Sequence, residues 1–134
     1  LAGALPVYAD PAASVTVTVI HARKGEPYLH EALKPLWETL RKTFGAKFDS
    51  YDQVSSQTRT LAVDQRFELS MPNGDSFAAI YGGITPEKGL LRISLEYGDF
   101  RTKVRIHDGG MFFQAGRSWK GGTLVLAIKA SIPK

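Results

Sequence analysis

Residues 108–133 read DGGMFFQAGRSWKGGTLVLAIKASIP, and this stretch indicates the fold class of the chain. It contains an Asp-Gly turn, a short aromatic strand MFFQA and a long apolar strand at residues 123–132. Residues 124–128 have no polar break, which is typical of a strand covered on both faces. We therefore expect a hairpin whose second strand is central in a sheet and whose long loop spans residues 116–123.

Strand signals with a period of two continue upstream of this hairpin. Residues 90–97 place four apolar side chains on one face, and residues 100–107 repeat the pattern after a Gly-Asp turn. Residues 72–75, Pro-Asn-Gly-Asp, predict a tight hairpin turn before a returning strand, because Asn-Gly readily adopts positive φ angles. Residues 15–20, VTVTVI, are β-branched and predict the first strand.

One helix interrupts the strand pattern. Its apolar stripe at helical spacing consists of Leu29, Leu33, Leu36, Trp37, Leu40 and Phe44. Pro35 places the firm part of the helix near that residue, with a looser turn upstream, and Gly45 supplies the stop. The polar residues 46–60 indicate an extended connector that contains at most one short strand. The predicted fold class is α+β, an antiparallel sheet of six or seven strands with one helix packed on a face.

Composition restricts the kinds of partner that the chain can have. It has 134 residues, 43% of them apolar, and a formal net charge of +4. This weak basic excess favours anionic partners but is not gathered in one block, so we do not expect a nucleic-acid binder. The absence of cysteine excludes disulfides and thiolate metal sites. No stretch has the 18 or so consecutive apolar residues that indicate a transmembrane segment.

The N-terminal residues carry the compartment signal. Residues 1–9, LAGALPVYA, resemble the end of a secretory signal, with cleavage before Asp10-Pro11. We expect residues 1–14 to be a signal-peptide remnant or a flexible N-terminal extension and residues 15–134 to form a single α+β domain. Export predicts a periplasmic or secreted protein, and the alternative is an extension of a cytoplasmic one.

The tip of the last hairpin is the first candidate binding site, at Arg117, Ser118, Trp119 and Lys120. Its glycines have the spacing of a phosphate loop, but a strand follows where such a loop needs a helix. Trp119 has two alternatives. It folds back onto the sheet, or it stands out as an anchor for a partner, since tryptophan and arginine are enriched at interfaces.

A basic stripe on one strand is the second candidate site, at Arg101, Lys103 and Arg105. The alternatives are a solvated outer face and an anion-binding surface for lipid headgroups, acidic polysaccharide or nucleic acid. Stacking aromatics are absent from this strand face, so single-stranded nucleic acid is not expected. Nearby, the consecutive Phe112 and Phe113 must point to opposite faces of their strand.

No catalytic, metal or cofactor site is predicted. His21, His30 and His107 lie in three separate segments, and no serine has the Gly-x-Ser-x-Gly setting of a hydrolase nucleophile. We therefore expect a non-enzymatic protein without a cofactor.

Three segments together resemble an uncharacterised family of small exported proteins of Gram-negative bacteria. They are LKPLWETLRKTFGAKFDSY at 33–51, RFELSMPNGDSF at 66–77 and VRIHDGGMFFQAGRSWKGGTLVLAI at 104–128. The resemblance implies export but no activity. The third segment is also similar to the terminal hairpin of outer-membrane secretins, which implies a sheet edge open to strand addition by another envelope protein.

These observations favour a non-enzymatic, exported binding or assembly module of the bacterial cell envelope, acting through the hairpin tip and the basic strand face. An envelope protein is the expected partner, with an anionic surface or polysaccharide as a second class of ligand. Two alternatives stay open. One is a carrier of a lipid-like ligand in a cavity between helix and sheet, and the other is a glycan or peptide hydrolase.

Overall fold

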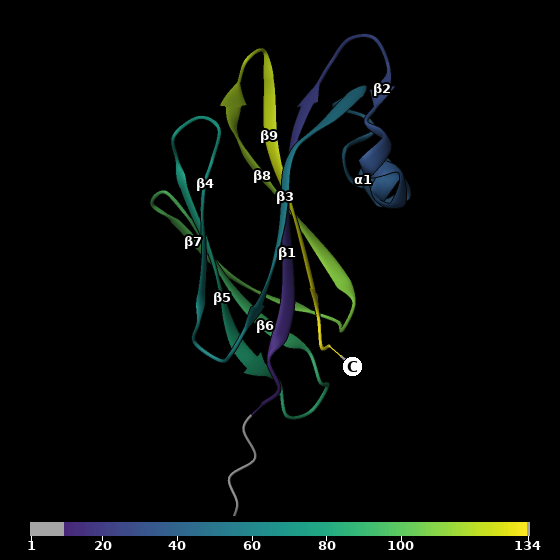
Figure 1. Cartoon of the computed structure of the whole chain (residues 1–134). Coiled ribbons are helices and arrows are strands. Elements are labelled where there is room, and N and C mark those ends of the chain that lie inside the picture. Colours follow the sequence, from purple (N-terminus) through teal and green to yellow (C-terminus); the bar gives the residue numbers. More distant parts are fainter. Residues whose placement is uncertain (1–9, 134) are drawn as a thin grey trace, which may run out of the picture.

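A computed structural model describes residues 10–133 of the chain. Two sheets lie face to face, and a single helical segment lies outside one of them (Figure 1). The elements are β1 (Ala13–Arg23), β2 (Tyr28–Leu29), the 3₁₀ helix η1 (Glu31–Leu36), α1 (Trp37–Phe44), β3 (Ser50–Leu61), β4 (Arg66–Ser70), β5 (Ser76–Ile84), β6 (Leu91–Tyr97), β7 (Phe100–Ile106), β8 (Gly110–Trp119) and β9 (Gly122–Ser131).

Sheet A has the strand order β2-β3-β1-β9-β8, and sheet B has the order β4-β5-β6-β7. Neighbouring strands are antiparallel except for the short parallel pair of β2 and β3. The predicted α+β class with antiparallel pairing is confirmed. The prediction of a single sheet of six or seven strands is wrong. Alternation of apolar residues shows that one face of each strand is buried, but it does not show which strands lie opposite that face.

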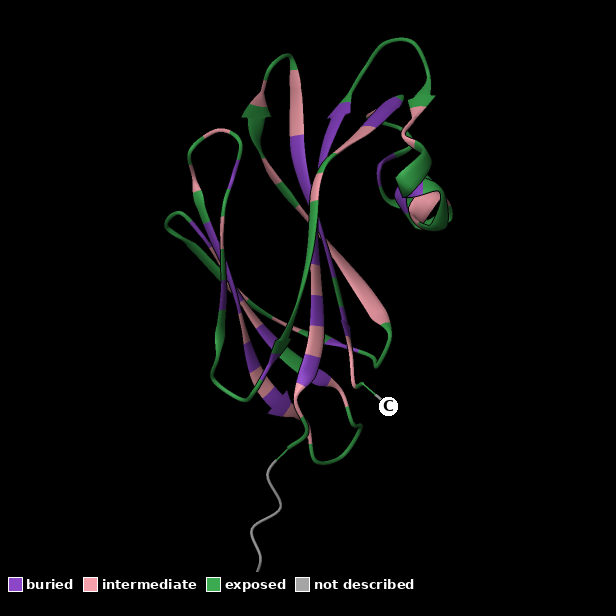
Figure 2. Ribbon diagram, in the orientation of Figure 1, coloured by how far each residue is buried: buried purple, intermediate pink, exposed green. Residues whose placement is uncertain are grey.

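The main core lies between the two sheets. The predicted apolar face of β6 is confirmed, since Ile93 and Leu95 are buried there, and Val15, Val17 and Val19 of β1 face them in the same core. Figure 2 shows buried residues alternating with intermediate ones along the first part of β1. Burying apolar area at about 25 cal/mol per Å² is the main driving force that holds sheet B against sheet A.

A second apolar layer joins the helical segment to the outer face of sheet A. Leu33, Leu40 and Phe44 pack against Val125 and Ala127 of β9. The odd and even residues of β9 thus face different layers, so the prediction of a strand covered on both faces is confirmed. The helical segment also follows the prediction, since its 3₁₀ turn contains Pro35 and its regular part begins at Trp37.

The prediction of an extended connector with at most one short strand at residues 46–60 is wrong about the length of the strand, because β3 spans Ser50–Leu61. β3 pairs with β1 along its length, but on its other side only the two residues of β2 bond to it. Residues Ser56 to Thr60 are exposed. A strand so near the sheet edge needs few apolar side chains, because little of it is covered. Polar residues there also discourage pairing with the strands of other chains.

The long hairpin loop predicted at residues 116–123 is also wrong. β8 continues through Trp119, and only Lys120 and Gly121 lie outside the two strands. Both residues have positive φ, 43° and 74°, as a tight two-residue hairpin turn requires. Gly116 and Gly122 are needed because neighbouring backbone approaches them closely, and the strand has a bulge between Ala115 and Ser118. Strand propensities take account of neither feature.

The predicted signal remnant at residues 1–9 lies outside the described residues. Where the described chain begins, the Ile84 backbone N–H donates to the Asp10 carboxylate at 3.1 Å, and the Tyr81 hydroxyl donates to the Pro11 carbonyl at 2.8 Å. Among residues 10–133, no helix is long and apolar enough to cross a membrane.

Candidate binding groove

Three segments that are distant in the sequence meet at one end of sheet A and enclose a wide, shallow groove of about 670 Å³. They are the end of β1, the turn after α1 and the β8–β9 hairpin, and the hairpin lies at the same end of the molecule as the β1–β2 loop (Figure 1). We call this the hairpin groove. Its lining consists of Arg23, Lys24, Lys47, Phe48, Ser118, Trp119, Lys120, Gly121, Gly122 and Thr123.

His21 holds Trp119 in place at the groove. Its Nε2–H donates to the Trp119 carbonyl oxygen at 2.9 Å, which requires the proton to be on Nε2. The imidazole also meets the indole ring edge-on, with 4.9 Å between the ring centroids. Trp119 is thereby half-buried against the main core while it still lines the groove. The folded-back alternative for this tryptophan is the one observed.

The turn after Trp119 is conformationally strained. Lys120 adopts a φ of 43°, which costs free energy for a residue with a side chain. In this conformation its ammonium group lies 4.8 Å from the centre of the Trp119 indole, a cation–π contact. The turn therefore presents a cation and an aromatic ring as one unit.

Gly122 allows β9 to approach β1 closely beneath the groove. A Cβ atom at this position would meet the Ala22 carbonyl oxygen at 2.4 Å and His21 Nε2 at 2.7 Å. Only a residue without a side chain fits there unless the backbone moves. The contact between β1 and the hairpin thus depends on Gly122.

On the other side of the groove, Asp49 holds the backbone on either side of Lys24. Its carboxylate accepts a hydrogen bond from the Gly25 backbone N–H at 3.1 Å, and its own N–H donates to the Arg23 carbonyl at 2.8 Å. Phe48 packs against Phe44 with 6.1 Å between centroids. These contacts tie the β1–β2 loop to the turn after the helix.

The groove is strongly basic. Four cations line it, Arg23, Lys24, Lys47 and Lys120, and no carboxylate does. None of the four forms a salt bridge within residues 10–133. Unpaired cations attract an acidic surface, and the aromatic ring beside them can bury apolar area of the same partner.

The predicted tip residues do not all face this groove. Ser118, Trp119 and Lys120 line it, whereas the Arg117 side chain is directed to Asp75 in the β4–β5 hairpin, 3.7 Å away. This ion pair links the two sheets at their edges. The predicted stripe of Arg101, Lys103 and Arg105 is exposed on β7, in the other sheet, and is not part of the groove.

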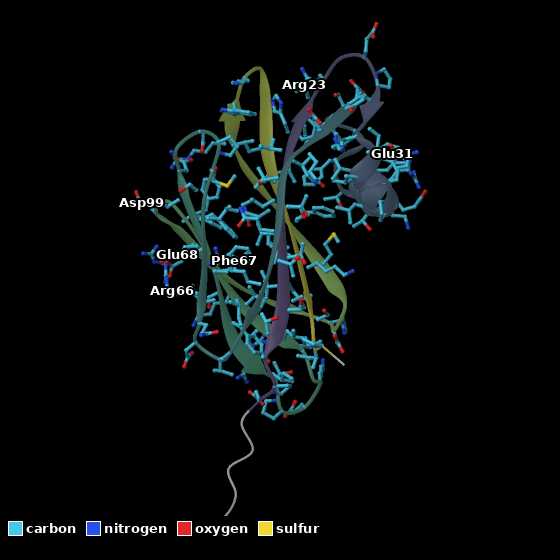
Figure 3. The ribbon with its side chains drawn as sticks, viewed as in Figure 1. Arg23, Glu31, Arg66, Phe67, Glu68 and Asp99 are labelled. Carbon is cyan, nitrogen blue, oxygen red and sulfur yellow. The ribbon has the colours of Figure 1, made fainter. Side chains whose placement is uncertain are left out.

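The outer face of sheet B also contains a depression with two carboxylates, of about 290 Å³. Arg66 lies between them, 3.0 Å from Glu68 and 2.9 Å from Glu96, and both Arg66 and Glu68 point away from the core while Phe67 points into it (Figure 3). The hydrogen bond from Arg66 lowers the pKa of Glu96. A glycosidase acid needs a raised pKa, so this pair gives the hydrolase hypothesis no support.

Metal binding has no candidate either among residues 10–133, where no group of three or more histidine or carboxylate side chains is arranged to hold an ion.

Reasoning from the sequence missed His21, Arg23, Lys24, Lys47 and Phe48 as neighbours of the tip. Arg23-Lys24 was visible as a basic dipeptide in a loop, but its separation from Trp119 by some ninety residues gave no sign that the two would meet. Only the antiparallel pairing of β1 with β9 brings them together.

Comparison with known proteins identifies no relative. No family model matches the chain, and no curated protein or solved structure is significantly similar to it. The class that the structure defines is therefore structural, a two-sheet, mostly β domain of the α+β class with a basic and aromatic groove at one end.

Proposed function

We propose that the protein is a non-enzymatic binding module of the bacterial cell envelope that docks an acidic protein partner in the hairpin groove. The observation that carries this proposal is the convergence of four cations and Trp119, without a carboxylate, at the meeting point of three loops. Tryptophan and arginine are the residues most often found at the energetic centre of protein interfaces. A wide, shallow groove suits a macromolecular partner better than an enclosed small molecule.

The groove is suited to this role because its aromatic ring is already in place. His21 and Lys120 hold the Trp119 ring from two sides. A ring that is fixed before binding loses less conformational entropy when the partner arrives. The cations supply long-range attraction to an acidic surface, which raises the association rate at low salt.

The carrier hypothesis receives less support than the docking hypothesis. The space between helix and sheet A is filled by Leu33, Leu40, Phe44, Val125 and Ala127. A lipid chain would have to displace these side chains, and interiors packed in this way resist insertion.

The proposal is tested by titrating the protein with poly-L-glutamate in a calorimeter. We expect binding that weakens as salt increases and that weakens at least tenfold in the double variant Trp119→Ala, Lys47→Ala. Lys42→Ala is the matched control, because it removes a lysine from the adjacent helix outside the groove. Equal weakening by Lys42→Ala would contradict the proposal, and preferential binding of polygalacturonate would replace the protein partner with an acidic polysaccharide.

The envelope location is a separate part of the proposal. It is supported by residues 1–9 and their resemblance to the end of an export signal. We expect the protein from its native cells to be found in the periplasmic or secreted fraction, with Asp10 as its first residue. Recovery of residues 1–9 on a cytoplasmic protein would contradict the envelope assignment and leave the groove unaffected.

A further inference from the structure

The outer face of sheet B holds a second group of cations, formed by Arg92 of β6 with Lys103 and Arg105 of β7. In the strand register, Arg92 lies directly opposite Arg105, and Lys103 is its diagonal neighbour. On one face of an antiparallel pair, Cβ atoms are about 5 Å apart when opposite and about 7–8 Å apart on the diagonal. One small anion can therefore contact all three side chains.

The charge of this group is not compensated within the described part of the chain. Like charges directly opposite each other on a sheet destabilise it. Within residues 10–133, none of the three cations forms a salt bridge, although Glu87 lines an adjacent depression with Arg92 and Arg105. On the same face, Arg66 by contrast is bound by two carboxylates. An uncompensated arginine pair is the arrangement that an anion would stabilise.

The surface between these cations is hollow. A depression of about 400 Å³ is lined by the three cations together with Gly82, Ser94 and two β-strand neighbours. Gly82 leaves its floor open, and Ser94 lies directly opposite Lys103 and adds a hydroxyl group. We call this the sheet B depression.

We propose that the sheet B depression binds a phosphate or sulfate group. Two guanidinium groups, an ammonium group and a hydroxyl offer more donors than the two oxygens of a carboxylate can accept, whereas a tetrahedral oxyanion accepts several at once. The fork of arginine also matches the geometry of such oxyanions. This inference goes beyond the proposed function, because the depression lies on the other sheet from the hairpin groove.

The test is an NMR titration of the protein with inorganic phosphate, following the arginine side-chain Nε–H signals at constant ionic strength. We expect the Arg92 and Arg105 signals to shift with phosphate and sulfate, and less with acetate or chloride. The double variant Arg92→Gln, Arg105→Gln should bind phosphate at least tenfold more weakly. Arg101→Gln, on the same strand but opposite Glu96, should bind as the unchanged protein does.

Three further variants test the shape and the charge of the sheet B depression separately. Gly82→Val fills the floor without changing charge, and Gly82 has no positive φ that would forbid a side chain. It should weaken phosphate binding, while Trp119→Ala should not. Arg92→Gln should also melt at a higher temperature than the unchanged protein without phosphate, since it removes a like-charge pair, and phosphate should narrow that gap.

The source of the anion is distinguished by parallel measurements with phosphatidylglycerol vesicles, heparin and inorganic phosphate. Binding to any of them that requires both Arg92 and Arg105 supports the proposal and identifies the source. Equal shifts with chloride, or equal phosphate binding by the double variant, would overturn it.

Discussion

His21 Nε2 lies 2.9 Å from the carbonyl oxygen of Trp119, across 98 residues of sequence. This hydrogen bond joins β1 to the end of β8 and fixes the ring that lines the hairpin groove. His21 is 9% exposed, so its loss would remove both this hydrogen bond and the edge-on contact with the indole ring from a largely buried place.

Replacing His21 by alanine should therefore lower the free energy of unfolding by about 1–3 kcal/mol, through the loss of one hydrogen bond and of the ring contact with Trp119. The fluorescence maximum of Trp119 should also move to longer wavelength. This shift is measured in a Trp37→Phe background, so that Trp119 is the one tryptophan that emits. His107→Ala is the control, because that histidine is exposed and should change stability by no more than about 0.5 kcal/mol. Equal losses in the two variants would show that the His21 contact is not stabilising.

The Lys120→Asn variant separates stability from binding. Asparagine tolerates positive φ, and Asn-Gly is the favoured pair in this turn. The free energy of unfolding should therefore rise by a few tenths to about 1 kcal/mol. The same change removes a groove cation and its contact with Trp119, so poly-L-glutamate should bind more weakly. Chemical denaturation and calorimetry measure the two effects. A variant that is stabler and binds equally well would show that the strain at Lys120 serves no binding role.

Alanine substitutions test the two apolar layers on either side of sheet A. Leu126 faces the main core and Leu40 lies in the helix layer, and both are fully buried. Each Leu→Ala change should cost about 2–5 kcal/mol. Thr60→Ala, on the exposed part of β3, should stay within about 0.5 kcal/mol. A small loss at Leu40 would mean that the helix is not packed on the sheet.

The ion pair of Arg66 with Glu96 predicts a pH-dependent contribution to stability. Arg66 lowers the folded-state pKa of Glu96, so the pair stabilises the fold above the unfolded pKa, and this contribution is lost as the pH falls through the folded pKa. The Arg66→Gln variant should have a lower melting temperature than the unchanged protein at neutral pH. The difference between the two melting temperatures should disappear as the pH falls through the folded-state pKa of Glu96. Arg105→Gln, which breaks no ion pair in residues 10–133, should show no such closing gap.

Much of the β pattern could be predicted because its cause is local. The alternation at Leu91, Ile93 and Leu95 reflects one buried face. A turn forms at Asn73-Gly74 as predicted, but only Gly74 of the pair has the positive φ expected there. The kink-prone Pro35 likewise marked the start of the regular helix.

The division into two sheets and the composition of the groove depend on contacts between distant residues. β3 is polar because it lies near a sheet edge, and nothing within its own sequence reveals that position. Gly122 similarly looked like part of a flexible loop, although its role is to admit the backbone of Ala22. The tip residues were proposed as a site from their type alone, whereas their neighbours on β1 and after α1 required the structure.

The central claim, that the hairpin groove docks an acidic envelope protein, is tested most directly by photo-cross-linking in intact cells from a photoreactive residue at position 118. We predict one adduct with an acidic envelope protein, which disappears when Trp119 and Lys47 are replaced by alanine and does not form from position 58 on β3. Absence of any adduct from position 118, or the same adduct from both positions, would contradict the account.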